Sequence, residues 1–196
     1  MHDRDPARVM GTIVSAFVAD PVERWLWPEP WRYLAHFPDF VAAFGGAAEI
    51  STLGNDLAAV AMWLPPGMGP DGDRIVAVLE HTVPADRLED AFAVLEQMDA
   101  AHPREPHWYL PWLAVDPARQ GSGLGATLLA RDLEARAGHL PAYLETPNPR
   151  TVPFYERHGF ATIAVSQAGR CPPITSMLRH PDPRADSAAG CRPAVA

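Results

Sequence analysis

Lysine is absent from this chain, and all 16 of its basic residues are arginine. A Schiff-base lysine and a lysine general base are therefore excluded. So is the phosphate loop of nucleotide hydrolases, which needs a lysine directly after its last glycine. Any chemistry that this protein performs must rely on other residue types.

Cysteine is scarce as well. The two cysteines, Cys171 and Cys191, are too few for a disulfide framework or a cysteine metal cluster. The histidines at positions 36, 81 and 107 do not have metal-ligand spacing. We therefore expect no metal site.

Long apolar runs are missing too, because none approaches the roughly 20 residues that a membrane-spanning helix needs. The first residues are polar and include acids, unlike a secretory signal. These features predict a cytoplasmic protein with no membrane partner, either a monomer or a homodimer.

Positive charge is in short supply, since 24 acidic residues outnumber the basic ones and give a formal net charge of −8. Nucleic-acid binding needs a basic surface for the phosphates, so this balance argues against a nucleic-acid partner. An acidic field instead attracts a cationic substrate, such as a small-molecule amine.

The chain has 196 residues, of which 47% are hydrophobic, and this suits one domain with one sizeable core. We expect a single mixed α/β domain over residues 1–180. The Pro-, Ala-, Arg- and Asp-rich residues 181–196 predict a disordered tail.

Local patterns predict most of the elements. Residues 9–17 fit either a strand or an opening helix, and four prolines (21, 28, 30 and 38) are expected to break residues 20–44 into short helices. The other expected elements are a hairpin over 47–52 and 56–64, a loop over 65–72, helices over 87–101, 127–136 (ending near Gly138) and 151–158, strands over 109–115 and 141–146, and a final antiparallel pair over 160–166 and 174–178.

A glycine-rich turn follows the apolar run 109–115 and opens a helical pattern. It reads Gln120-Gly121-Ser122-Gly123-Leu124-Gly125-Ala126. Such a turn presents unpaired backbone N–H groups at the positive end of a helix dipole, which suits a phosphate or pyrophosphate. A dinucleotide site is the rival interpretation, since the turn also satisfies G-x-G-x-x-A and Glu145 could bind a ribose. However, residues 116–120 separate the turn from its strand, and too little chain remains for several more βα units.

Two motifs in this half of the chain resemble those of the GNAT superfamily of N-acetyltransferases. The first, Val115-Asp116-Pro117 followed by the glycine turn, is similar to the family's acetyl-CoA motif, V-x-P-x-x-Q-G-x-G-x-G. The second consists of Asn148, Tyr155, Glu156, Gly159 and Phe160. Within the family, the second half is most similar to the puromycin-acetylating members.

The resemblance implies the GNAT fold, a central mixed, mostly antiparallel sheet that splays between two parallel strands, with helices on both faces. It also implies acetyl-CoA as cofactor and CoA as product. The implied cofactor contacts are Leu113, Ala114, Val115, Gln120, Gly121, Ser122, Gly123, Leu124, Gly125, Ala126, Asn148 and Tyr155.

The implied reaction is direct attack by an amine on acetyl-CoA in a ternary complex. Tyr155 is the candidate acid for the leaving thiolate, although it could be a packed aromatic residue. Glu145 is the candidate partner of the amine, although it could be a strand-end residue or pair with an arginine; His107 or Asp20 could serve as base instead. The expected substrate pocket comprises Asp20, Trp27, Trp31, Trp63 and Tyr109.

Two other functions fit the same residues. Acetylation of a protein N-terminus or lysine would require an open groove in place of an aromatic pocket. A catalytically silent acyl-CoA-binding sensor would keep the cofactor motif without turnover.

Overall fold

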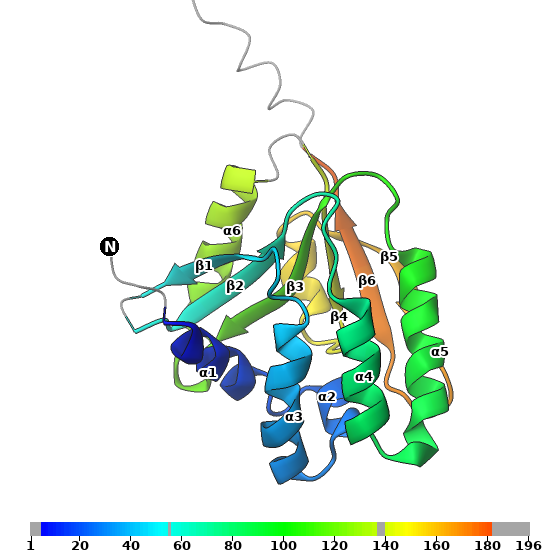
Figure 1. Cartoon of the computed structure of the whole chain (residues 1–196). Helices are drawn as coiled ribbons and strands as arrows, with labels where there is room; N and C mark the ends of the chain where they lie inside the picture. Colours follow the sequence, from blue (N-terminus) through cyan, green and yellow to red (C-terminus); the bar gives the residue numbers. More distant parts are fainter. Residues whose placement is uncertain (1–4, 55, 137–139, 182–196) are drawn as a thin grey trace, which may run out of the picture.

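The fold is built on a six-stranded sheet with helices packed on both of its faces (Figure 1). The computed structural model describes residues 5–54, 56–136 and 140–181. The strand order is β1-β2-β3-β4-β6-β5; β3 and β4 run parallel, and the other neighbouring pairs run antiparallel. The predicted fold class is confirmed. The strands are β1 (Glu49–Leu53), β2 (Ala59–Leu64), β3 (Trp108–Val115), β4 (Ala142–Thr146), β5 (Ala161–Ser166) and β6 (Ile174–Arg179).

Helices α1 to α5 cover one face of the sheet, and α6 and α7 cover the other (Figure 1). Each face has its own buried apolar cluster. The helices are α1 (Pro6–Ala16), α2 (Pro21–Leu26), α3 (Pro30–Ala42), α4 (Gly72–Thr82), α5 (Ala85–Ala101), α6 (Leu124–Arg136) and α7 (Val152–Glu156), with a short 3₁₀ turn at Pro117–Arg119.

Residues 6–42 contain the three helices α1, α2 and α3, and α3 continues past a proline that was expected to break it. Of residues 9–17, which fitted either element, 9–16 belong to α1 and Phe17 is its C-cap; Asp5 caps the first turn, and Ile13 is fully buried. Pro38 was expected to break the chain, but it lies inside α3. Helix α3 buries Phe37 against the core, and the carbonyl that Pro38 leaves unpaired belongs to Leu34, which is exposed and can bond to water.

Helix α4 is an element that local patterns did not predict. The expected loop over 65–72 ends one residue early, because Gly72 begins α4. Asp71 caps this helix by accepting from the Arg74 N–H at 3.0 Å, and Ile75 and Leu79 are its buried residues. The cap and the four-residue spacing of these apolar side chains are the signals that predict such a helix.

The final antiparallel pair, β5 and β6, is confirmed. The strand next to β4 in the sheet is β6, although β5 comes first in the chain. Strand β6 inserts between β4 and β5 and pairs with both. Gly159, which was expected to end the preceding helix, has a left-handed φ of 85°. The helix end near Gly138 and almost all of the expected tail lie outside the described residues.

A β-bulge in β3 produces the splay in the sheet. Met62 of β2 pairs with Trp112 and Leu64 pairs with Tyr109, so β3 holds one extra residue between these pairs. A bulge bends its strand and increases the local twist. The parallel pairing of β3 with β4 extends from Trp108↔Ala142 only to Tyr109↔Tyr143. Beyond that point the two strands separate, as predicted.

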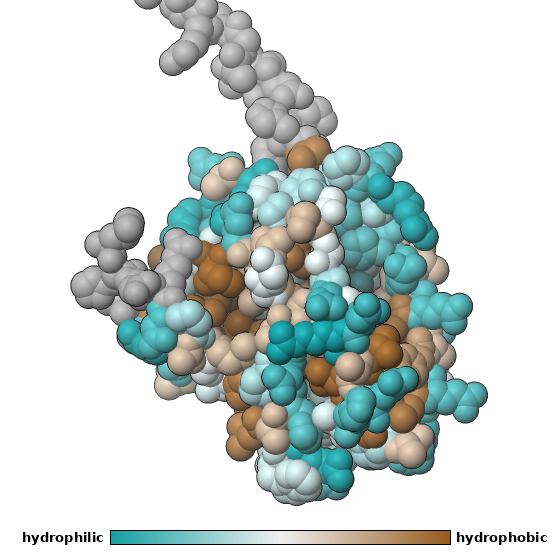
Figure 2. Space-filling view, viewed as in Figure 1, coloured by the Kyte–Doolittle hydropathy of each residue, from teal (hydrophilic) through white to brown (hydrophobic). Residues whose placement is uncertain are grey.

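The outer surface is mostly hydrophilic in the view of Figure 2, with apolar residues exposed over α4, among them Val76. Within the described part of the chain, no helix is long and apolar enough to cross a membrane.

Candidate active site

A cleft of about 750 Å³ opens where β3 and β4 separate. Its walls come from the end of β3, the glycine turn, the end of β4 and helix α7. This volume falls within the range of ordinary ligand pockets. Of the residues expected to bind the cofactor, the following line the cleft: Leu113, Val115, Gln120, Gly121, Gly123, Leu124, Gly125, Ala126, Asn148 and Tyr155.

The glycine turn has the backbone geometry of an anion site. Gly121 and Gly123 have φ angles of 77° and 85°, in the left-handed region that a Cβ disfavours. A Cβ on Gly125 would lie 3.2 Å from Val115 Cγ2, so glycine allows α6 to begin close against β3. The first intrahelical bond in this turn runs from Thr127 N–H to the Gly123 carbonyl at 3.0 Å. The Ser122 N–H donates to the Arg119 carbonyl at 3.4 Å, so the N–H groups of residues 123–126 are the ones available to bind an anion at the helix N-terminus.

Arginines add positive charge to the same cleft. Arg119, Arg150 and Arg157 line it, although the chain as a whole is strongly acidic. Arg119 also contacts Asp56 at 3.1 Å, but both side chains are about half exposed, so this pair is weak. The helix N-terminus and these guanidinium groups suit the phosphates of acetyl-CoA.

The turn from β4 to α7 fixes the position of Tyr155. Thr146 and Thr151 share a hydrogen bond of 2.7 Å, and the Asn148 side chain accepts from the Arg150 N–H at 3.1 Å. Tyr155 lines the cleft and packs edge-on against Phe154. Burial, and then the negative charge of Asp20, raise the pKa of the Tyr155 hydroxyl. This hydroxyl therefore keeps its proton and can only donate it or share it.

Glu145 lies at the end of β4 with both carboxylate oxygens engaged. Tyr109 donates to Oε2 at 2.6 Å, and Tyr143 donates to Oε1 at 2.7 Å. Burial raises the pKa of Glu145, and the two tyrosine hydrogen bonds oppose that shift. A buried carboxylate with a raised pKa is a stronger base than an exposed one.

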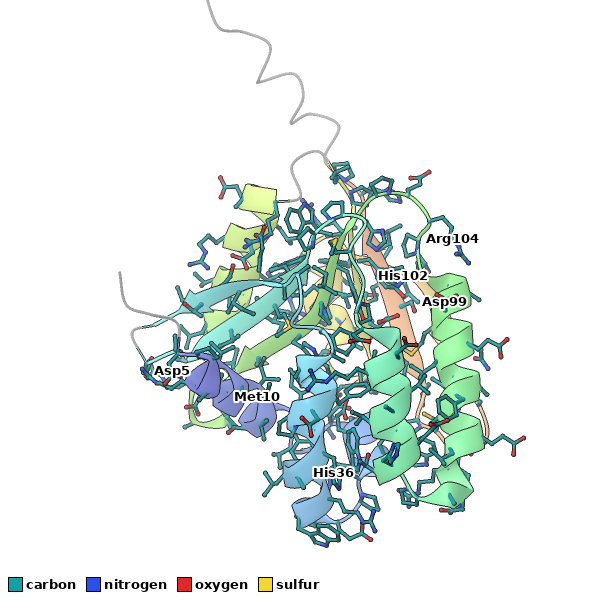
Figure 3. The ribbon with its side chains drawn as sticks, viewed as in Figure 1. Asp5, Met10, His36, Asp99, His102 and Arg104 are labelled. Carbon is teal, nitrogen blue, oxygen red and sulfur yellow. The ribbon has the colours of Figure 1, made fainter. Side chains whose placement is uncertain are left out.

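Two histidines pack against the tyrosines that bond to Glu145. His102 follows α5 (Figure 3) and packs edge-on against the rings of Tyr109 and Tyr143. Its Nε2 atom lies 3.0 Å from His107 Nε2. Burial, followed by the charge of His107, lowers the pKa of His102 to about 4. His102 is thus neutral near pH 7 and acts as a packing partner of the tyrosines.

A second, smaller hollow of about 120 Å³ adjoins the cleft. Phe17, Pro111, Glu145 and Pro147 line both hollows. The smaller one continues into the space between the sheet and helices α2 to α5, and its walls are largely aromatic and aliphatic. Glu145 thus stands where a phosphate-binding cleft meets an apolar pocket.

Two more acidic residues border these hollows. Asp20 lines the cleft and caps α2 by accepting from the Val22 N–H at 3.0 Å. Burial raises the pKa of Asp20 to about 6, against the opposing effect of its backbone hydrogen bonds. Glu23, one turn further along, lines the smaller pocket.

The structure separates the other residues of the expected substrate pocket. Tyr109 lines the smaller pocket. Trp27 is fully buried and donates to Thr82 Oγ1 at 2.9 Å, whereas Trp31 is 62% exposed. Trp63 is buried on the α6 face and donates to Asp132 Oδ2 at 2.9 Å. These three tryptophans line neither hollow.

Two of the expected cofactor contacts also lie away from the cleft wall. Ala114 is buried in the cluster beneath α1 to α5, and the Ser122 hydroxyl donates to the Arg119 carbonyl. Several wall residues were not predicted: Phe17, Glu23, Pro111, Arg119, Arg150 and Arg157.

The six-stranded sheet, with its helices and its splay between two parallel strands, is a fold of the GNAT type. The family model of the Acetyltransferase (GNAT) domain matches residues 73–162, which run from α4 to β5. This segment is therefore similar in sequence to GNAT domains.

Solved structures of acetyltransferases have a similar fold. A crystal structure of histone acetyltransferase HPA2 and related acetyltransferase from Corynebacterium glutamicum superimposes with a TM-score of 0.66, at 24% identity over 100% of this chain and 96% of that one. Arylalkylamine N-acetyltransferase 2 from Aedes aegypti has a TM-score of 0.59, at 12% identity over 92% and 98%. These two likenesses show the fold.

One sequence match is more local. A mycothiol acetyltransferase from Kineococcus radiotolerans is 46% identical over 55 residues, which are 26% of this chain. The matched segment spans only 18% of that protein's length.

Proposed function

We propose that this protein transfers the acetyl group of acetyl-CoA to the primary amine of a small molecule, by direct attack in a ternary complex. The observation that carries this proposal is the junction at Glu145. There, a cleft with the backbone geometry of an anion site meets a small apolar pocket, so an acyl donor and an acceptor can approach one carboxylate from two sides.

Bound acetyl-CoA supplies an acetyl thioester and leaves as a thiol. The amides of the glycine turn, with Arg119 and Arg150, would hold its phosphates. Leu113 and Val115, on the cleft side of β3, would position its pantetheine arm. A backbone amide of this strand can donate to the thioester carbonyl oxygen and stabilise the charge that develops there.

An alkyl amine has a pKa near 10, close to that of lysine, and attacks only when neutral. Glu145 takes one proton from the amine nitrogen, directly or through water. Its raised pKa makes it a better acceptor for this proton. After attack, the amine nitrogen loses a second proton as the C–S bond breaks, and this proton neutralises the leaving thiolate. Tyr155 donates a hydrogen bond to the departing sulfur. Because a tyrosine pKa normally exceeds that of a thiol, sharing the proton is more favourable than transferring it completely.

The small volume of this second pocket favours a small molecule over a protein acceptor. A protein N-terminus or lysine needs an open groove, whereas this hollow holds only about 120 Å³. The mycothiol and arylalkylamine relatives are named for small-molecule substrates, which agrees with this choice.

The test is release of free thiol from acetyl-CoA in the presence of a panel of amines: arylalkylamines, puromycin, polyamines, amino acids and peptides. Tyr155→Phe should lower kcat by about 10-fold or more while CoA affinity stays the same, because one charge-assisted hydrogen bond to sulfur is lost. Tyr33→Phe is the matched control, since this hydroxyl bonds to the Val14 carbonyl at 2.7 Å, away from the cleft.

Thiol release that depends on one class of amine and falls in Tyr155→Phe would support the proposal. Tight binding of acetyl-CoA without thiol release from any amine would contradict it and favour a sensor. Preferred acetylation of peptides would contradict the small-molecule acceptor.

A further inference from the structure

Glu23 is a buried carboxyl group without a partner. The residue is 5% exposed, and its Oε2 atom is fully buried with no hydrogen-bond partner within the described chain. Its neighbour Arg24 donates to the Pro28 carbonyl instead. Leaving a buried polar group unsatisfied costs about 1–3 kcal/mol, and more for a charge. The fold therefore keeps an acceptor that only an additional molecule can satisfy.

Helix capping does not account for Glu23. In a capping box, the side chain at the third helical position accepts from the backbone N–H of the N-cap residue. The N-cap here is Asp20, whose N–H donates to the Phe17 carbonyl at 2.9 Å. The Glu23 carboxylate therefore does not accept the capping hydrogen bond that its position in α2 predicts.

Apart from Glu23 and Glu145, the side chains that line this pocket are mostly apolar. Its walls come from α2, α3, α4 and α5 on one side and from Tyr109 and Trp112 of β3 on the other. At about 120 Å³ it is slightly smaller than the engineered apolar cavities of about 150 Å³ that bind benzene. It therefore suits a group no larger than one aromatic ring.

We infer that Glu23 selects the acceptor: a primary amine attached to one compact apolar group of about the size of a phenyl ring, whose ammonium pairs with the Glu23 carboxylate. This inference rests on the proposed function, because it names the substrate class of the same site. Burial and the neighbouring Asp20 raise the pKa of Glu23, and a bound cation would offset both effects.

Glu23 and Glu145 have different tasks in this pocket. Glu145 already accepts from two tyrosine hydroxyls and stands at the border with the cofactor cleft. The Oε2 atom of Glu23 has no hydrogen-bond partner within the described chain, and Glu23 lines the smaller pocket but not the cleft. Glu23 binds the cationic acceptor, and Glu145 removes the proton before attack.

The test compares two ligands of nearly equal shape, 2-phenylethylamine and 2-phenylethanol, by calorimetry on the CoA-bound protein. A hydrogen bond to a charged group is typically worth 10- to 100-fold in affinity, so the wild type should prefer the amine by about that factor. Glu23→Gln should reduce the preference to within about threefold while CoA affinity is unchanged. Glu96→Gln removes a charge from an exposed site of α5 and should retain the full preference.

The size limit is tested with the same assay. Benzylamine and 2-phenylethylamine should bind, whereas the wider 2-(1-naphthyl)ethylamine and the longer spermidine should bind at least about tenfold more weakly. Tighter binding of spermidine or of a peptide amine would overturn the inference, as would a full amine preference in Glu23→Gln.

These outcomes separate the two proposals. Amine selectivity that depends on Glu23, without thiol release, would contradict the acetyl-transfer function but leave the amine site standing. Thiol release from amines with no effect of Glu23→Gln on selectivity would contradict the inference but leave the proposed function standing.

Discussion

Gly123→Ala tests whether the glycine turn is an anion site. The φ angle of Gly123 is 85°, and a Cβ built there would have no atom within 4 Å. The cost of the substitution is therefore conformational: about 1–2 kcal/mol for an L-residue in the left-handed region. For a domain of this size, that cost lowers Tm by about 2–8 °C.

The same substitution should weaken CoA binding. A turn that relaxes toward negative φ rotates the N–H groups that precede α6 away from the phosphates. Loss of even one charge-assisted hydrogen bond would weaken CoA binding by about tenfold or more. Scanning calorimetry with and without CoA measures both effects, since a bound ligand raises Tm according to its affinity.

Gly11→Ala is the matched control. Gly11 lies in α1, and a Cβ there would also have no atom within 4 Å. Alanine in a helix interior should stabilise the protein by about 0.5–1 kcal/mol and leave CoA binding unchanged. If Gly123→Ala kept both the Tm and the CoA affinity of the wild type, the backbone argument for the turn would be refuted.

Three further outcomes are expected. The pKa of Asp20 is raised to about 6 in the folded protein, so the protein loses stability as the pH rises from about 4 to 6 and this carboxyl group ionises. Asp20→Asn should flatten this fall in the free energy of unfolding, measured with urea. Asparagine still caps α2. Asp132→Ala should destabilise the protein by about 1–3 kcal/mol in the same assay, because it leaves the buried Trp63 Nε1–H without its acceptor. Tyr109→Phe should move the acidic limb of the kcat–pH profile to higher pH, because it removes a hydrogen bond that lowers the pKa of Glu145; an unshifted limb would argue against Glu145 as base.

Local sequence information was enough to predict the glycine turn that lines the larger cleft. The glycine turn, the strand before it and the helix after it are consecutive in the chain, so their geometry follows from residues close in sequence. Gly121 and Gly123 have the positive φ angles that such a turn requires. The hairpin of β1 and β2 follows from equally local patterns.

The acceptor pocket could not be predicted in the same way, because its walls come from segments far apart in the chain. Trp63 lies in a strand in which every residue is buried, so alternation does not show which face its ring occupies. Glu23 fits a helix-capping position, and only the bond from Asp20 to Phe17 shows that its carboxylate is not used there. Tertiary packing of α2 against the sheet decides the role of such a residue.

The extra residue in β3 has a consequence for how such enzymes diversify. Without the bulge, Tyr109, Leu113 and Val115 would share one face of the strand by simple alternation. With it, Tyr109 and Trp112 border the acceptor pocket, while Leu113 and Val115 border the cofactor cleft. Substitutions that reshape one cavity therefore need not alter the other. A protein engineer could therefore change Trp112, which lines the smaller pocket but not the cleft, and leave the wall of the cleft intact.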